Sequence, residues 1–171
     1  MSAGESALIV AVPEAEPAVG AHRAELDAGG VPAHVTVLFP FLPPDRLDDD
    51  VLATVADVVG SVPAFDVALA RVAWFGDRVV WLAPEPAAPF RALTIALWHR
   101  FPEAPPYGGE HTDLVPHLTI GHDAPRERLA AAAEDVAAHL PIAARVEAVR
   151  LIARGGVTEP WRTVRELPLG R

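Results

Sequence analysis

The chain contains no cysteine and no lysine among its 171 residues. The lack of cysteine excludes disulfides, thiolate nucleophiles and cysteine-ligated zinc. All 14 basic residues are arginine. Chemistry that needs a lysine amine is therefore excluded as well, including Schiff bases, lysyl-nucleotide intermediates and the lysine of a P-loop.

Long apolar runs are also missing, since no stretch approaches the roughly 20 residues that a membrane helix needs. The first residues, MSAGESALIVAVPEAEP, lack the basic start and small-residue cleavage site of a signal peptide. Hydrophobic residues make up 51% of the chain and charged residues 22%, which is typical of a globular domain. We therefore expect a cytoplasmic protein without a membrane partner.

Positive charge is scarce, and the formal net charge is −9 at pH 7. This balance argues against a protein that holds long nucleic acid by neutralising its phosphates. It leaves room for a small nucleotide or an RNA end bound in a local pocket. The length fits one domain over residues 1–171, and we expect a monomer.

Apolar periodicity and turn residues predict a mixed α+β chain. Strands are expected at 7–12, 34–39, 65–75, 78–82, 116–121, 144–153 and 163–167, and helices at 17–28, 48–59, 87–101 and 125–140. Both halves of the chain then contain strand and helix pieces around one histidine-bearing strand. We predict a single α+β domain of two pseudo-symmetric lobes, with antiparallel sheets and outer helices flanking a central cleft.

The same short pattern occurs on two of these strands, as PAHVTVLFPF and VPHLTIGHDA. Each contains a histidine, one residue, a threonine and an aliphatic residue. Because side chains alternate along a strand, His34 and Thr36 share one face, and so do His117 and Thr119. With 7 histidines in the chain, only roughly 0.07 such matches are expected by chance. Two matches therefore indicate that both motifs serve the same function.

Two imidazoles across a cleft suit acid–base chemistry near neutral pH. One histidine can be neutral and accept a proton while the other is charged and donates one. The hydroxyls of Thr36 and Thr119 can donate hydrogen bonds to an anion between them. A phosphodiester is the anion that fits an in-line displacement between two such pairs.

The paired motifs HVTV and HLTI resemble those of the 2H phosphoesterase superfamily, which includes the 2'-5' RNA ligases and RNA 2',3'-cyclic phosphodiesterases. The stretch GVPAHVTVLFPFLPP is similar to bacterial members, and the likeness extends over nearly the whole chain. It implies two lobes around a cleft, His34 and His117 as the acid–base pair, and Thr36 and Thr119 as phosphate ligands. It also implies a metal-independent reaction without a cofactor, favouring hydrolysis of 2',3'-cyclic phosphates to 2'-phosphomonoesters. Ligation would be the reverse step.

Three further residues are candidate substrate contacts. Arg154 stands at a strand end before two glycines, where backbone can approach a ligand, although a plain surface arginine fits equally well. Tyr107 and Phe41 could stack on a base, and for Phe41 core packing is the stronger interpretation. Trp74, Trp81 and Trp98 are expected in the core, while the role of Trp161 stays open.

Two other classes of function remain open. One is a module that binds a nucleotide or RNA end without catalysis, and the other is a metal hydrolase using His111, His117 and His122. Continued alternation would point His122 away from His117, which disfavours the metal site. Within the favoured class, the substrate could also be a non-RNA cyclic phosphate such as ADP-ribose cyclic phosphate.

Overall fold

The computed structural model describes residues 4–26, 30–110 and 114–171. Its strands are Glu5–Ala11 (β1), His34–Leu38 (β2), Phe65–Phe75 (β3), Val79–Glu85 (β4), Leu118–His122 (β5), Ile142–Val146 (β6), Ala148–Arg154 (β7) and Arg162–Pro168 (β8). Its α-helices are Glu16–Leu26 (α1), Asp49–Gly60 (α2), Ala88–Arg100 (α3) and Arg126–Ala137 (α4), and short 3-10 helices cover Pro13–Ala15, Pro44–Arg46 and Pro106–Gly109. The predicted end of the first helix, at 27–28, lies outside the described residues.

All eight strands join one antiparallel sheet, in the order β6-β3-β4-β5-β2-β1-β7-β8. The two histidine-bearing strands, β2 and β5, are neighbours at its centre. The α+β fold with two similar lobes is confirmed. The expectation of separate sheets is wrong, because β2 and β5 pair at Val35 and Leu118 and so link the two sets of strands.

The two halves of the chain exchange one strand each. The first half runs β1-α1-β2-α2-β3 and the second β4-α3-β5-α4, followed by β6 and β7. β3 pairs with β4 of the second half, while β7 pairs with β1 of the first half. The halves are therefore interlocked rather than placed side by side.

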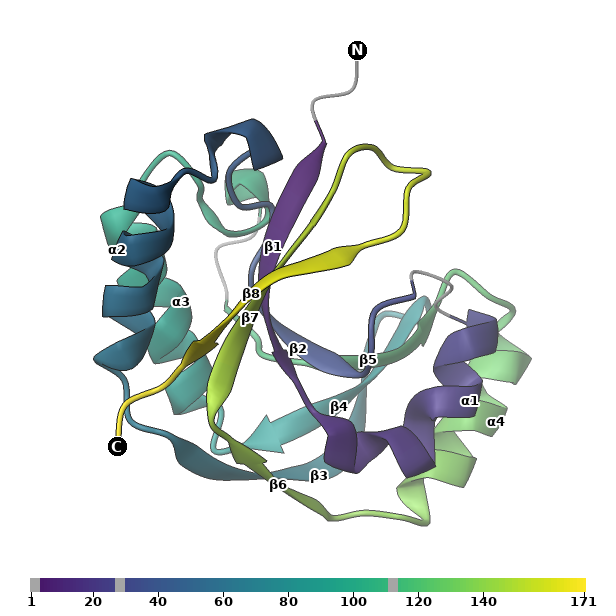
Figure 1. The fold of residues 1–171 in the computed structure, drawn as a ribbon. Coiled ribbons are helices and arrows are strands. Elements are labelled where there is room, and N and C mark those ends of the chain that lie inside the picture. Colours follow the sequence, from purple (N-terminus) through teal and green to yellow (C-terminus); the bar gives the residue numbers. More distant parts are fainter. Residues whose placement is uncertain (1–3, 27–29, 111–113) are drawn as a thin grey trace.

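Helices form two pairs on either side of the strands, α2 with α3 and α1 with α4 (Figure 1). Each pair also crosses between halves, since α1 packs on β5 and α3 packs on β2. α2 begins where the Asp48 side chain accepts a hydrogen bond from the Val51 backbone N–H, the usual cap of a helix start. No helix within the described residues is long and apolar enough to cross a bilayer.

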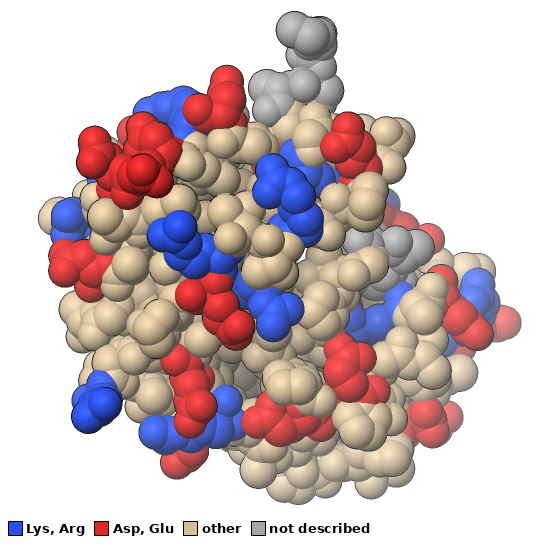
Figure 2. Space-filling model, in the orientation of Figure 1, with Lys and Arg blue, Asp and Glu red and all other residues tan. Residues whose placement is uncertain are grey.

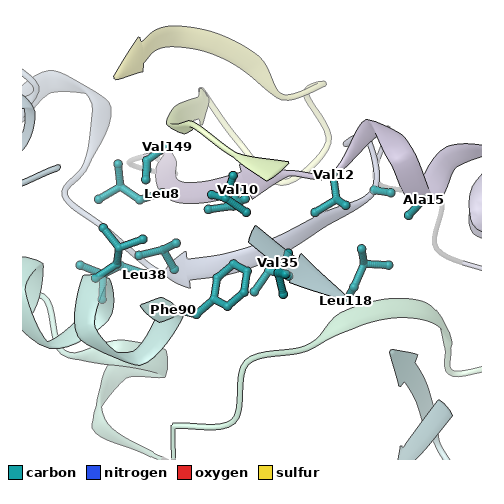
Figure 3. Close-up of a cluster of buried hydrophobic side chains, with 14 of the residues drawn as sticks. Leu8, Val10, Val12, Ala15, Val35, Leu38, Phe90, Leu118 and Val149 are labelled. Atoms are coloured by element: carbon teal, nitrogen blue, oxygen red, sulfur yellow. The ribbon is translucent and has the colours of Figure 1, made fainter. Parts of the chain in front are cut away.

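The main core gathers side chains from strands of both halves and from the helices. Figure 3 shows Val10 of β1, Val35 of β2, Leu118 of β5 and Phe90 of α3 in one cluster. The aliphatic residues of the two motifs, Val35, Val37, Leu118 and Ile120, are at most 3% exposed. Burial of these residues fixes both motif strands from behind, as the alternation predicted.

The single strand predicted at 144–153 is wrong. It is divided at Glu147 into β6, which pairs with β3, and β7, which pairs with β1. The alternation of buried residues changes phase here, from Ala144 and Val146 in β6 to Val149 and Leu151 in β7. Periodicity reports which residues are buried and not which strand they pair with, so this phase change does not reveal the change of partner.

Candidate active site

The two motifs meet where β2 and β5 pair. Because Val35 lies opposite Leu118 in an antiparallel pair, His34 comes beside Thr119, and Thr36 comes beside His117. All four point to the face opposite the core. The two histidines are diagonal neighbours, and such residues lie about 7–8 Å apart between Cα atoms. The register thus places two imidazoles and two hydroxyls around one point.

Both imidazoles are oriented in the same way by their own backbone. Nδ1 of His34 donates to the carbonyl of Pro32 at 2.8 Å, and Nδ1 of His117 donates to the carbonyl of Val115 at 2.7 Å. A carbonyl oxygen only accepts, so the proton of a neutral ring lies on Nδ1. This leaves Nε2 as the atom that exchanges protons in both rings.

A cavity of about 240 Å³ opens over this face. It is lined by Ala7, Ile9, Arg23, Val31, His34, Thr36, Phe39, Thr119, His122, Ile152 and Trp161. Of the four motif residues, His34 and both threonines line the cavity, and His117 does not. None of these lining residues is acidic, while one arginine and two histidines are present. The cavity therefore favours an anion, although the whole chain is acidic.

Arg23 of α1 is the most buried charged residue at the cavity and is 5% exposed. Its guanidinium donates to the carbonyl of Thr119 at 2.5 Å and to the carbonyl of Val31 at 3.0 Å. It thus connects the second motif with the segment that leads into the first. A positive charge is thus fixed in the lining that also contains both threonines.

His117 has an aromatic environment of its own. Its ring meets Phe75 edge-on at 5.1 Å and Trp81 at 5.8 Å, and these two rings stack on each other at 4.7 Å. Burial lowers the pKa of His117 below the ordinary value for histidine, and the hydrogen bond to Val115 partly offsets this shift. The neutral form of His117 is favoured.

His122 lies on the cavity side of β5, in contrast to the expectation from strict alternation. The pairing with β4 shifts register between Val80 and Trp81, so that one extra residue of β5 interrupts the alternation before His122. Gly121 lies in this irregular segment, where a side-chain carbon would come within 2.6 Å of Leu26 in α1. His122 donates from Nδ1 to Asp123 at 3.1 Å, and this bond lowers the pKa of Asp123.

The three candidate substrate contacts lie outside the cavity lining. The Arg154 guanidinium is bound to the carboxylate of Glu5, with a 2.6 Å bond from Nε, and its carbon lies 4.5 Å from the centre of the Trp161 ring. The backbone N–H of Tyr107 donates to the carbonyl of Phe39 at 2.6 Å, which sets Tyr107 beside a lining residue. Phe41 is buried against Phe101 in the core, which agrees with the core-packing role favoured by the sequence.

Among the described residues, no group of three histidine or acidic side chains is placed to hold a metal ion. His111, one of the residues considered for a metal site, lies outside the described residues. Trp81 is buried as predicted and Trp74 is half-buried, but Trp98 is 40% exposed on α3. The helical pattern placed Trp98 on the wrong face.

The family model described as the 2'-5' RNA ligase superfamily matches residues 10–158, which include both motifs. The chain belongs to the 2'-5' RNA ligase superfamily. This confirms the resemblance to the 2H phosphoesterases that the two motifs carry. No curated protein sequence matches the chain.

Solved structures with a similar fold include TT0787 of Thermus thermophilus, which is 18% identical with a TM-score of 0.67, covering 98% of this chain and 99% of that one. Escherichia coli LigT in complex with ATP is 17% identical with a TM-score of 0.62, and LigT in complex with 3'-AMP is 17% identical with a TM-score of 0.61. Each LigT comparison covers 98% of this chain and 99% of the other. At such identities the likeness shows the fold.

Sequence reasoning missed Arg23 and left Trp161 undecided. Arg23 did carry a signal, because it lies between Val19 and Leu26 at the spacing of the buried face of α1. A charged residue on an apolar helix face calls for a buried partner. Trp161 precedes β8 without any periodic pattern, so its position follows only from the fold.

Proposed function

We propose that this 2H phosphoesterase hydrolyses 2',3'-cyclic phosphates of RNA ends or small nucleotides to 2'-phosphomonoesters. The observation that carries the proposal is the register of β2 and β5, which sets His34 beside Thr119 and Thr36 beside His117. A protein that only bound a nucleotide would not need two imidazoles, each beside a threonine, on one face of the sheet.

The reaction needs one proton removed and one supplied. Nε2 of one histidine takes a proton from water, whose oxygen forms a bond to phosphorus. The bond from phosphorus to the 3' oxygen breaks, and the other imidazolium donates a proton to that leaving oxygen. The product is a 2'-phosphomonoester with a free 3'-hydroxyl. Base and acid act on opposite sides of phosphorus, as an in-line displacement requires.

The remaining charge is stabilised by the cavity. The hydroxyls of Thr36 and Thr119 donate to the non-bridging oxygens, and Arg23 adds a fixed positive charge in the same cavity lining. No step of this scheme uses a metal ion or a cofactor. The lowered pKa of His117 favours its neutral form, which suits the role of the base.

Small substrates are favoured by charge and size. The cavity of about 240 Å³ lies below the roughly 300–1,000 Å³ of sites that enclose a drug-sized ligand. Acidic and basic side chains are interspersed on the face shown in Figure 2, without a continuous basic surface. LigT has been solved in complex with 3'-AMP, with ATP and with NADP+, which supports a nucleotide as the ligand here.

The test is an assay of the purified protein against 2',3'-cyclic nucleotides, RNA with a 2',3'-cyclic phosphate end, 2',5'-linked oligonucleotides and ADP-ribose cyclic phosphate. Phosphorus NMR identifies the product. We expect 2'-phosphomonoesters from the cyclic nucleotides. Binding of nucleotides without turnover of any of these compounds would instead support a non-catalytic module.

A further inference from the structure

The cavity has two chemically different ends. His34, Thr36, Thr119 and His122 form the polar end, at β2 and β5. Ala7, Ile9 and Ile152 form an apolar floor on β1 and β7, and Val31, Phe39 and Trp161 pack against it. We refer to these last six residues as the apolar end. If the phosphate of a ligand lies at the polar end, the rest of the ligand lies over this floor.

The register of the strands shows how the two ends join. Thr36 lies opposite Ile9 on β1, and Ala7, on the same face of β1, lies opposite Ile152 on β7. From β2 to β7 the floor spans two strand spacings, about 10 Å. A ribose and a base can extend from a phosphate over this length. Trp161 stands at the far side of the floor, just before β8.

The Trp161 ring is held by two neighbouring side chains, Arg154 and Phe39. The Arg154 guanidinium covers the ring at 4.5 Å, and Glu5 fixes that guanidinium from β1. Phe39 contacts the ring in an edge-on arrangement at 6.3 Å. The guanidinium covers one face of the ring, and Trp161 belongs to the cavity lining whereas Arg154 does not. An aromatic ring is thus held in the cavity lining before any ligand arrives.

We propose that Trp161 is the stacking surface for the nucleobase of the substrate, with Arg154 as the positioning residue that holds its ring. This rests on the proposed function in that it takes the ligand to be a nucleotide with its phosphate at the polar end. Every base has an aromatic face, so stacking selects for a nucleobase without selecting its sequence. The preferred substrate would then be a cyclic phosphate that carries a base, whichever base it is.

Binding of adenosine 2'-monophosphate and of inorganic phosphate, measured by calorimetry, tests the proposal without any need for turnover. Trp161→Leu keeps an apolar side chain but removes the aromatic surface. We expect it to weaken binding of the nucleotide about 5- to 150-fold, the usual worth of base stacking, and to leave phosphate binding unchanged. Trp161→Phe should retain most of the affinity. Arg154→Met should weaken nucleotide binding less than Trp161→Leu, again without affecting phosphate.

Trp98→Ala is the matched control, because it removes a tryptophan that is exposed on α3. A second measurement covers the case in which Trp161→Leu does not fold. The wild-type protein has 4 tryptophans, and Trp161→Phe identifies the indole N–H signal of Trp161 in its NMR spectrum. Addition of the nucleotide should shift that signal, and addition of phosphate should not.

Three results would overturn the proposal. One is nucleotide affinity in Trp161→Leu within twofold of wild type. Another is an equal loss of nucleotide and phosphate binding in a folded variant. The third is an indole signal that does not respond to the nucleotide. If only the proposed function fails, the result is different: the protein binds the nucleotide through Trp161 but turns over no cyclic phosphate.

Discussion

The two motif strands present a histidine and a threonine on the same face of the sheet but have different neighbours. On β1, Ile9 lies opposite Thr36, and on β4, Trp81 lies opposite Thr119. The two positions correspond in the two halves of the chain, since β1 and β4 are the first strands of those halves. An aliphatic side chain lies on one side of the site and an indole on the other.

This difference divides the site into an open side and a filled side. Beside Ile9, the apolar floor leaves room for a ligand. Beside Trp81, the stacked rings of Phe75 and Trp81 take up the space and pack against His117, whose pKa falls through burial. A duplicated motif can therefore place two imidazoles in different surroundings, because the neighbouring strands, and not the motifs, set those surroundings.

The largest expected effect comes from removing either imidazole. His34→Ala and His117→Ala should each lower turnover of a 2',3'-cyclic nucleotide by about 10²–10⁴-fold, the usual contribution of a positioned acid or base. His99→Ala, on the exposed face of α3, serves as the control and should leave turnover unchanged. Activity close to wild type in both histidine variants would contradict the proposed mechanism.

A smaller loss is expected at the threonines. Thr36→Val and Thr119→Val should each remove one of the proposed hydrogen bonds to a charged phosphate, worth about 1.5–3 kcal/mol or roughly 10- to 150-fold in kcat/KM. Thr163→Val, at an exposed position of β8, is the matched control. If circular dichroism shows that the two variants are unfolded, the threonines have a structural role.

The pH profile of turnover should depend on the filled side of the site. One histidine must be neutral and the other charged, so kcat/KM should be bell-shaped. Phe75→Ala exposes His117 to water, which favours the charged form and raises its pKa. If His117 is the base, the acidic limb moves to higher pH; if it is the acid, the alkaline limb does.

We expect this shift to be partial, because Trp81 still covers the ring. Phe75→Leu keeps the side chain apolar and large and should leave the profile close to that of the wild type. A profile that is unchanged in Phe75→Ala would show that His117 does not control either limb.

The smallest expected effect is that of a chelator. Incubation with EDTA followed by gel filtration should leave turnover within about twofold of the untreated protein, since neither the two-histidine scheme nor the threonine hydroxyls need a metal ion. Loss of activity that one divalent ion restores would move the assignment to a metal-dependent hydrolase.

The sequence was sufficient for the parts of the fold that have a local cause. Alternation in HVTV and HLTI predicted that Val35 and Leu118 would be buried and that the histidines would face away from the core, as the structure has them. The adjacency of β2 and β5 could not be read in this way, because strand pairing joins residues far apart in the chain. His122 was misplaced because a register shift in β5 leaves no periodic signal.

The surroundings of the site were the hardest part to predict. Arg154 stands at a strand end as expected, yet only the paired strands show that Glu5 holds it against Trp161. Likewise, the aromatic neighbours of His117 come from β3 and β4, which are distant in sequence. Side chains that set the protonation and specificity of a site are brought there by topology, which a single sequence does not encode in any short pattern.

The exchange of β3 and β7 between the halves has a consequence for unfolding. Each half depends on a strand of the other, so neither can lose its structure while the other keeps a complete sheet. We expect a single cooperative transition in urea, in which loss of secondary structure and loss of nucleotide binding occur at the same denaturant concentration. An intermediate with one half folded would have no intact site, since β2 and β5 each contribute half of it.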